Sequence, residues 1–177
     1  MLYTIPYASP LGGLWLAADD RGVTGVWFAG EKYFPNWRGV SRKERETPIL
    51  RETKRWLDIY FHGAEPDFMP PLHPIGSDFQ QVVWKILRQI PYGTTRTYGD
   101  IAAQIARARG VAKMSAQAVG GAVGHNDISI LIPCHRVVGK SGSLTGYAAG
   151  LEKKIRLLTL ERVDMSRFFV PKKGTAL

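Results

Sequence analysis

The chain has a single cysteine, Cys134, among its 177 residues. One thiol excludes a disulfide within the chain, and it equally excludes a cysteine-rich zinc site. What remains is an inert buried thiol or a nucleophile. Cys134 follows a proline and precedes His135 and Arg136, and a nearby imidazole or cation stabilises the reactive thiolate. The residue pattern therefore favours a nucleophile.

The sequence also lacks any apolar run close to the roughly 20 residues that a membrane span needs. Its first residues, 1–6, lack the basic and apolar regions of a signal peptide. We therefore expect no membrane partner and a reducing, cytoplasmic location, associated with the nucleoid in a prokaryote or inside the nucleus of a eukaryote. The hydrophobic content of 45% is enough for a real core.

Negative charge is scarce in the second half of the chain. Residues 1–78 carry 9 Lys/Arg and 10 Asp/Glu, a net charge of −1, whereas residues 79–177 carry 15 Lys/Arg and 5 Asp/Glu, a net charge of +10. The half that holds Cys134 thus has the whole positive excess. This asymmetry indicates a polyanionic partner, with nucleic acid favoured over a basic surface kept for solubility.

The first 75 residues combine short strands with one helix. Apolar segments separated by Gly and Asp predict an antiparallel meander of strands at residues 3–7, 14–18 and 25–28. Thr47 and Pro48 predict a helix start, because threonine caps well and proline is tolerated at the first helical position. Four prolines within residues 66–74 exclude a helix or central strand there. We therefore expect a linker and a domain boundary at about residue 76.

The second half is patterned mainly as helices. Ser77 precedes apolar residues at helical spacing, which predicts an amphipathic helix. Two short helices, from Thr97 to Gly110 and over residues 115–123, resemble a helix-turn-helix, and the second consists almost wholly of small residues. A last helix is expected over residues 151–161.

The segment Ile130–Gly139 closely resembles the active-site segment of the O6-alkylguanine-DNA alkyltransferases, also called methylated-DNA–protein-cysteine methyltransferases. Its Pro-Cys-His-Arg core with apolar flanks is highly specific. Further matching residues lie across the second half: Phe79-Gln80, Val83-Trp84, Ile90-Pro91-Tyr92-Gly93, Thr97-Tyr98-Gly99, Ala118-Val119-Gly120, Asn126, Thr145-Gly146-Tyr147 and Glu161. The first 75 residues match only in layout. The resemblance implies an α+β fold: a small N-terminal α/β domain with an antiparallel sheet (1–75), then a mainly helical, winged-helix-like C-terminal domain with a helix-turn-helix (76–177).

The resemblance implies direct-reversal DNA repair without a cofactor or a metal. Cys134 would displace the guanine from the alkyl carbon and keep the alkyl group as a thioether, which has no carbonyl for water to attack, so the protein acts once. His135 would take the thiol proton through a bound water, and Glu161 would orient and stabilise the imidazole. Asn126 would belong to the same hydrogen-bond network, and Tyr98 would donate to O6 of the leaving guanine.

The resemblance also implies DNA and substrate contacts. Because guanine O6 lies inside the duplex, the base must be flipped out, and the family places the small-residue helix in the minor groove. Gln117 stands where the family commonly has an arginine finger, and it lacks the charge and planar guanidinium of arginine. Further DNA-binding candidates are Thr97, Ala116 and Gly120; pocket candidates are Val123, Tyr147, Ala148 and Ala149. The implied partner is double-stranded DNA with O6-alkylguanine, or with O4-alkylthymine as a second candidate base, bound by a monomer.

Three other positions need a separate interpretation. Asp127 stands where the family usually has proline, which predicts a looser loop before the active site. Ala149 replaces a glycine and could exclude bulky alkyl groups. Arg136 could contact a phosphate or pair with an acid of the N-terminal domain, and the interdomain pair is favoured because Arg136 adjoins a buried site.

Two other classes of function remain open on the sequence. A DNA-binding regulator could use the helix-turn-helix, with Cys134 as a redox or alkylation sensor, but the His135–Glu161 pair would then have no task. A cysteine hydrolase would turn over repeatedly and would leave the charge of +10 unexplained. Alkyltransferase-like proteins, which bind lesions without chemistry, lack the cysteine.

Overall fold

The computed structural model describes residues 1–172 and separates them into two compact units. The first unit contains Met1–Ile75 together with Asp127–Leu131; the second contains Gly76–Asn126 and the chain from Ile132 onward. Residues 127–131 were expected in the second domain, whereas their contacts place them in the first unit. No helix within residues 1–172 is long and apolar enough to cross a membrane.

The first unit is built on a four-stranded sheet of order β3-β2-β1-β4. Its strands are β1 (Leu2–Ser9), β2 (Gly12–Ala18), β3 (Val23–Phe28) and β4 (Arg42–Glu44). The predicted antiparallel meander is confirmed, with Ile5 opposite Leu16 and Leu16 opposite Val26. The sequence did not indicate β4, which pairs in parallel with β1, because its three residues are charged and exposed and show no apolar alternation.

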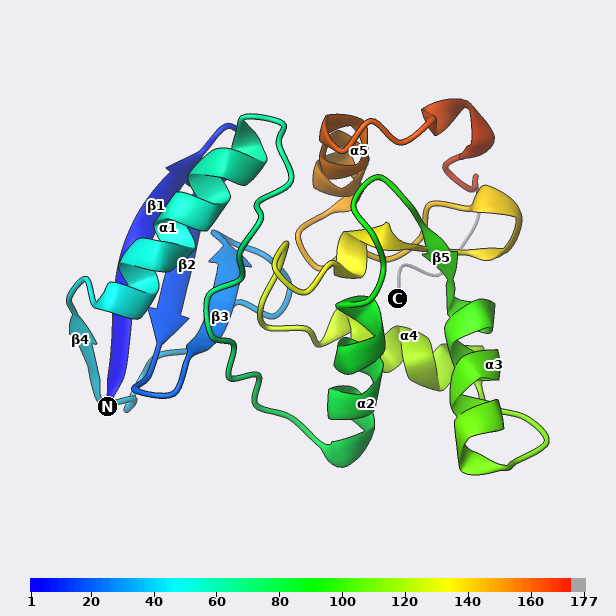
Figure 1. The fold of residues 1–177 in the computed structure, drawn as a ribbon, viewed down its shortest axis with the longest axis horizontal. Helices are drawn as coiled ribbons and strands as arrows, with labels where there is room; N and C mark the ends of the chain where they lie inside the picture. The colour runs from blue at the N-terminus through cyan, green and yellow to red at the C-terminus, as the bar shows by residue number, and fades with distance from the viewer. Residues whose placement is uncertain (173–177) are drawn as a thin grey trace. The chain divides into compact units, whose positions relative to one another are not determined.

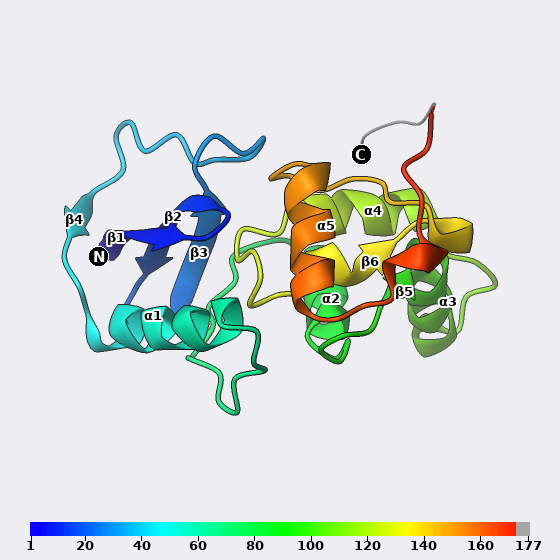
Figure 2. The same ribbon diagram turned by 90° about the horizontal axis from the view of Figure 1, so that it is seen from above.

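Helix α1 (Pro48–Phe61) covers one face of this sheet (Figure 2). As predicted, Thr47 caps it, accepting a hydrogen bond from the backbone N–H of Leu50 at 3.3 Å. Its inward face buries Leu50, Leu57 and Tyr60 completely. The segment between β3 and β4 lies over the opposite face of the sheet in Figure 2 and brings Trp37 to 5.2 Å from Trp15, ring centroid to ring centroid.

The second unit contains four helices among its described residues (Figure 1): α2 (Asp78–Leu87), α3 (Tyr98–Arg109), α4 (Ala116–Gly124) and α5 (Leu151–Leu160). Capping boxes begin α2 and α3, where Ser77 pairs with Gln80 and Thr97 with Asp100. The left-handed backbone of Gly110, with φ of 64°, ends α3 before the chain turns into α4. The two helices predicted to form the helix-turn-helix are therefore present.

A two-stranded parallel sheet was not predicted. It pairs β5 (Arg96–Thr97) with β6 (Val137–Val138). Strands of two residues are too short to show any periodicity in the sequence. The pairing matters for the site because β5 leads directly into Tyr98 at the start of α3, whereas β6 directly follows Cys134–Arg136.

Candidate active site

Cys134 lies at a tight bend of the chain in the second unit. Pro133 has φ of −80° and ψ of 64°, and the backbone N–H of Cys134 donates to Ile132 O at 2.8 Å, which together make an inverse γ-turn. The pyrrolidine ring fixes this φ in advance. A single 3-10 turn, Cys134–Arg136, follows, and the cysteine is only 6% exposed. The structure thus holds the thiol in one orientation beneath the surface.

Asn126 contacts the sulfur directly. Its Nδ2 donates to Cys134 Sγ at 3.2 Å and to the carbonyl of Ile132 at 2.8 Å. The second bond orients the amide, so the first presents an N–H to the sulfur. Such a donor favours the anionic form of the thiol over the neutral form. The structure therefore brings Asn126 and Cys134 together, in line with what the resemblance to the alkyltransferases implied.

Glu161 is the centre of a buried hydrogen-bond network at the C-terminal end of α5. Its carboxylate accepts from His135 Nε2 at 2.6 Å, from Arg136 Nε at 2.8 Å and Nη2 at 3.0 Å, and from the backbone N–H of Gly93 at 3.2 Å. Burial by itself would raise the pKa of Glu161, but the hydrogen bonds and charges of His135 and Arg136 outweigh burial and hold the pKa at about 2. The carboxylate is therefore ionised at neutral pH.

His135 is fully buried. Burial lowers its pKa, against the opposing effect of Glu161, so the ring is neutral at physiological pH. Because Glu161 is ionised and can only accept, we assign the ring proton to Nε2, and Nδ1 then carries the lone pair. This tautomer leaves Nδ1 as the basic nitrogen.

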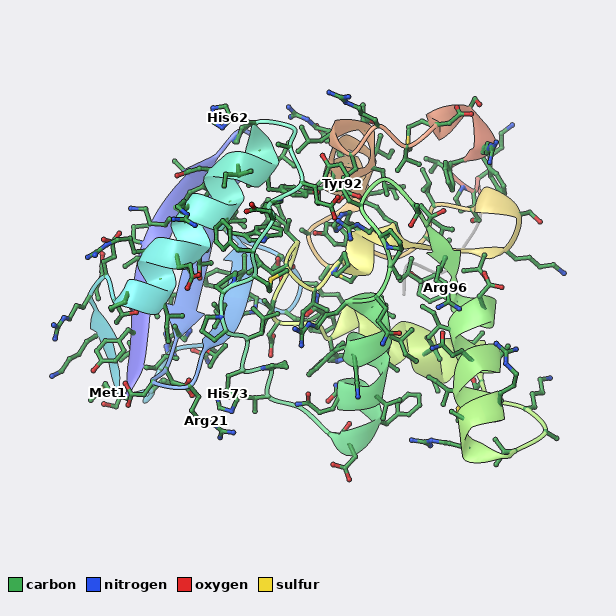
Figure 3. All side chains as sticks on the ribbon, viewed as in Figure 1. Met1, Arg21, His62, His73, Tyr92 and Arg96 are labelled. Carbon is green, nitrogen blue, oxygen red and sulfur yellow. The ribbon has the colours of Figure 1, made fainter. Side chains whose placement is uncertain are left out.

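Arg136 corrects one prediction. The favoured interdomain pair is wrong, because Arg136 forms its bidentate ion pair with Glu161 inside the second unit. Its Nη1 also donates to Ile90 O at 2.7 Å, and its guanidinium lies 5.7 Å from the ring centre of Tyr92, which is labelled in Figure 3 on the loop after α2. Arg136 is 8% exposed, so it ties the network together and has little surface to offer a phosphate.

Lys154 is a residue that sequence reasoning missed. Its side chain is completely buried, and Nζ donates to the carbonyl oxygens of Val137 at 2.5 Å, Thr145 at 2.8 Å and Gly146 at 3.2 Å. Burial lowers the pKa of Lys154 to about 8, although the charge of nearby Cys134 opposes the shift. Its spacing in the sequence could have indicated that it is buried. Lys154 lies three residues after Leu151 and four before Leu158, which places it on the inward face of α5.

Tyr98 begins α3 and is 7% exposed. Its hydroxyl donates to Thr145 O at 3.3 Å, the same oxygen that accepts from Lys154. Burial, and then the charge of Cys134, raise the pKa of Tyr98 well above its ordinary value. The phenol therefore stays protonated and remains a hydrogen-bond donor at any physiological pH.

A cavity of about 690 Å³ opens beside Tyr98. Its lining residues are Thr97, Tyr98, Gly99, Asp100, Ala116, Gln117 and Lys140. It therefore unites Tyr98 with three of the DNA-binding candidates and adds Lys140, an exposed cation that the sequence analysis did not single out. Arg96, labelled in Figure 3 at the start of β5, precedes Thr97 and donates from Nη1 to Gln104 Oε1 at 2.6 Å.

The lining does not include Cys134, nor the pocket candidates Val123, Tyr147, Ala148 and Ala149. Val123 is buried, and the other three candidates are half-buried on the segment before α5. Their role in holding an alkyl group stays a prediction.

Helix α4 presents only part of its small-residue surface. Ala116, Gln117 and Ala118 are exposed, and a Cβ added at Gly121 would meet no atom within 4 Å. Gly120 is buried next to Val119. The structure therefore argues against Gly120 as a DNA contact: it packs inward, whereas Gly121 lies on the open face of the helix.

Within residues 1–172, no group of three or more His, Cys, Asp or Glu side chains is arranged to hold a metal ion. The site consists of a thiol, an amide, a His–Glu–Arg network and a tyrosine.

Two family models match consecutive parts of the chain. Residues 1–74 match the 6-O-methylguanine DNA methyltransferase, ribonuclease-like domain, and residues 78–163 match the 6-O-methylguanine DNA methyltransferase, DNA binding domain. A methylated-DNA–protein-cysteine methyltransferase of Haemophilus influenzae is 42% identical over 165 residues, which are 92% of this chain and 87% of the relative. The constitutive enzyme of that name from Bacillus subtilis is 40% identical over 167 residues, 93% and 98% of the two chains.

Solved structures agree. The O6-methylguanine methyltransferase of Mycobacterium tuberculosis is 40% identical and covers 98% of this chain, and this chain covers 97% of it, with a TM-score of 0.78. A crystal structure of the Mycobacterium tuberculosis OGT in complex with DNA is also 40% identical, covers 94% of both chains and has a TM-score of 0.81. The chain therefore belongs to the methylated-DNA–protein-cysteine methyltransferase family.

Proposed function

We propose that this protein repairs O6-alkylguanine in double-stranded DNA by transferring the alkyl group to Cys134 in one irreversible turnover. One observation carries the proposal above all. The only thiol of the chain is buried, receives an N–H from Asn126, and is followed by a histidine whose Nε2 is committed to an ionised Glu161. An inert core cysteine needs none of these partners.

The first step is removal of the thiol proton. His135 Nδ1 is the available basic nitrogen, and the proton reaches it through a bound water. Glu161 stabilises the imidazolium that forms, and Arg136 keeps Glu161 in place and ionised. The N–H of Asn126 stabilises the thiolate that remains.

The second step is displacement at carbon. The sulfur of Cys134 forms a bond to the alkyl carbon as the bond from that carbon to O6 breaks, and guanine leaves with the electron pair. Tyr98 supports this departure because its hydroxyl is a donor that does not ionise; it turns from Thr145 O to the developing negative charge on O6. The thioether product cannot be hydrolysed, so each molecule acts once.

DNA would be bound by the basic half through the exposed face of α4 and the rim of the cavity. The open positions there, Ala116, Gln117, Ala118 and Gly121, let a helix approach the minor groove closely. Gln117 is proposed to fill the space left by the flipped base. We propose further that the protein acts as a monomer in the cytoplasm, that O4-alkylthymine is a second substrate base, and that the methyl group of Ala149 limits the size of the alkyl group.

The regulator with Cys134 as a sensor is not favoured, since the buried His135–Glu161–Arg136 network would have no task in it. A cysteine hydrolase is not favoured either: it would form a thioester that water cleaves, would turn over repeatedly, and would leave the charge of +10 on the second half unexplained.

Intact mass measurement tests the proposal. The protein is mixed with duplex DNA that contains one O6-methylguanine, and its mass is followed with time. We expect one methyl group per molecule, located on Cys134, and no further turnover with excess DNA. Repeated turnover would support a hydrolase, and an unmodified protein would contradict the proposal. Binding to the same duplex should weaken steeply with added salt, because phosphate neutralisation releases counterions.

A further inference from the structure

The segment Asp127–Leu131 has an unusual place in the chain. It belongs to the first unit, yet Asn126 directly before it and Ile132 directly after it belong to the second unit. Those flanking parts hold the Asn126–Cys134 contact, because Asn126 Nδ2 bonds to both Ile132 O and Cys134 Sγ. Residues 127–131 therefore form the loop that links Asn126 to its hydrogen-bond partners Ile132 and Cys134.

The segment is held beside β3 by an isolated bridge. The backbone N–H of Val26 donates to Asp127 O at 2.8 Å, and that of Ser129 donates back to Val26 O at 3.0 Å. These bonds make a parallel bridge between Val26 and Ile128, and Ile128 is fully buried. The first unit thus supplies both hydrogen bonds and a core for the segment.

The segment also contains strained backbone. Ile130 has φ of 73°, and the N–H of Leu131 donates across it to Ser129 O at 2.9 Å, which makes a γ-turn of the rarer, positive-φ kind. A β-branched residue strongly disfavours this region. Strained backbone of this kind persists only where the surroundings determine it, and Ile130 is 1% exposed. The anchoring to β3 is what can hold it.

One side-chain hydrogen bond completes the anchor. Trp27 Nε1, on β3, donates to Asp127 Oδ1 at 3.0 Å, although the two residues lie 100 positions apart in the chain. The indole is itself fixed: it is 6% exposed, and it lies so close over Gly25 that a Cβ there would come within 1.7 Å of the ring. The bond is partly buried, because Asp127 is half-buried, and a hydrogen bond to a carboxylate is stronger than one between neutral groups. It ties the first residue of the segment to a rigid part of the sheet.

We infer that the Trp27–Asp127 hydrogen bond holds the strained segment 127–131 in place and thereby positions Asn126 against Cys134, so that Trp27 and Asp127 are positioning residues for alkyl transfer. The inference rests on the proposed function, because it assigns the pair to that reaction. It also gives Asp127 a task, since its carboxylate supplies the acceptor that fixes the loop.

The test compares single-turnover methyl transfer from O6-methylguanine duplex at saturating protein, with DNA affinity measured separately. Trp27→Phe removes the N–H but keeps an aromatic ring, Asp127→Ala removes the acceptor, and Asp127→Asn keeps an oxygen acceptor in the same place. We expect the first two variants to transfer about tenfold more slowly with unchanged affinity, since a hydrogen bond to a charged group is lost. Asp127→Asn should restore most of the rate, and the double variant Trp27→Phe/Asp127→Ala should be no slower than either single variant.

Trp56→Phe is the matched control. Trp56 lies in the same unit, on α1, and its buried indole N–H has no hydrogen-bond partner within the described residues. This variant should transfer at the wild-type rate. Three outcomes would each overturn the inference. Trp56→Phe could transfer as slowly as Trp27→Phe, Asp127→Asn could be as slow as Asp127→Ala, or the double variant could lose the sum of the two single losses.

Amide hydrogen exchange separates this inference from the proposed function. The amides of Val26 and Ser129 should exchange faster in Trp27→Phe and Asp127→Ala than in the wild type, and Trp56→Phe should match the wild type. If the wild type transfers no methyl group, the proposed function fails whatever the exchange shows. If the wild type transfers the methyl group and Trp27→Phe and Asp127→Ala transfer it as fast as the wild type, the inference alone is overturned.

Discussion

The two units differ in how many acidic or basic side chains (Asp, Glu, His, Lys and Arg) they bury: among the described residues, only Glu31 is buried in the first unit, whereas the second unit buries a cluster. In the first unit, Glu46 pairs with Arg51 and Lys54 at the surface, where the side chains of the three residues are 36%, 70% and 41% exposed. In the second unit, His135, Arg136, Lys154 and Glu161 are all buried. Surface pairs contribute little to stability, whereas each buried charge must be matched by partners because desolvation opposes it. The second unit thus buries a cluster of charged groups that includes the residues next to Cys134, although it also has an exposed ion pair between Arg167 and Asp164.

The largest effect is expected at Cys134, in the second unit. Cys134→Ala should abolish methyl transfer and leave binding to O6-methylguanine duplex largely intact, because binding depends on the basic surface and not on the thiol. Mass measurement checks the loss of methyl transfer, and a binding titration checks that DNA binding is kept. Methyl transfer by this variant would contradict the mechanism.

Removing the centre of the buried network should have the next largest effect. Glu161→Gln leaves Arg136 and His135 without their anionic partner, and losing one member of a buried pair costs about 3–5 kcal/mol of stability. The alkyl-transfer rate should also fall, since the imidazolium loses its stabilising charge. Urea denaturation and single-turnover rates measure the two effects.

Glu161 should also make the stability of the second unit depend on pH. The pKa of Glu161 is about 2 in the folded protein against an ordinary value of 4.5, so its stabilisation is present above pH 4.5 and is lost as the pH falls towards 2. His135 acts in the same direction, because burial lowers its pKa and the unfolded chain takes up the proton first as the pH falls. The free energy of unfolding of the wild type should therefore decline on acidification. In Glu161→Gln the part of this decline that falls between pH 4.5 and 2 should be absent.

Lys154 should show a smaller effect at alkaline pH. Its pKa is about 8 when folded and 10.5 ordinarily, so the unfolded chain holds more protons between these values, and stability should rise with pH across this window. A difference of this size corresponds to about 3 kcal/mol at most. Denaturation at pH 7.5 and pH 10.5 should show the rise in the wild type and not in Lys154→Met; equal slopes would contradict the shift.

Gln117 tests the exposed part of the second unit. Gln117→Ala should slow methyl transfer from duplex DNA, because the unstacking cost of about a few kcal/mol is offset less well. It should barely change transfer from the free base O6-benzylguanine, provided that this compound fits beside Ala149, since nothing is flipped. Gln117→Arg should match or exceed the wild-type rate on duplex. Equal losses on both substrates would indicate pocket damage instead.

The smallest effect is expected in the first unit. Glu46→Gln breaks two exposed ion pairs, and surface pairs of this kind often contribute nothing measurable. The denaturation midpoint should stay within experimental error of the wild type, and methyl transfer should be unchanged. A loss as large as that of Glu161→Gln would show that the contrast between the units is mistaken.

The sequence predicted the elements whose signals are local. Thr47, Ser77 and Thr97 marked helix starts because a cap and its partner lie within three residues of each other, and short apolar segments separated by turn residues predicted the meander. The strands β4, β5 and β6 were missed because a strand of two or three residues is too short to show a periodic pattern of apolar residues. Resemblance to a family, and not periodicity, supplied the roles of the residues around Cys134.

What the sequence by itself determined was therefore the single thiol with its neighbours, the basic half and the capped helices. Only the tertiary structure decided which partners the charged groups take. It paired Arg136 with Glu161 inside one unit, buried Lys154 against three carbonyls, turned Gly120 inward and joined Trp27 to Asp127. These partners lie up to 100 residues apart, and a charged side chain looks the same in a sequence whether water or a buried acceptor satisfies it.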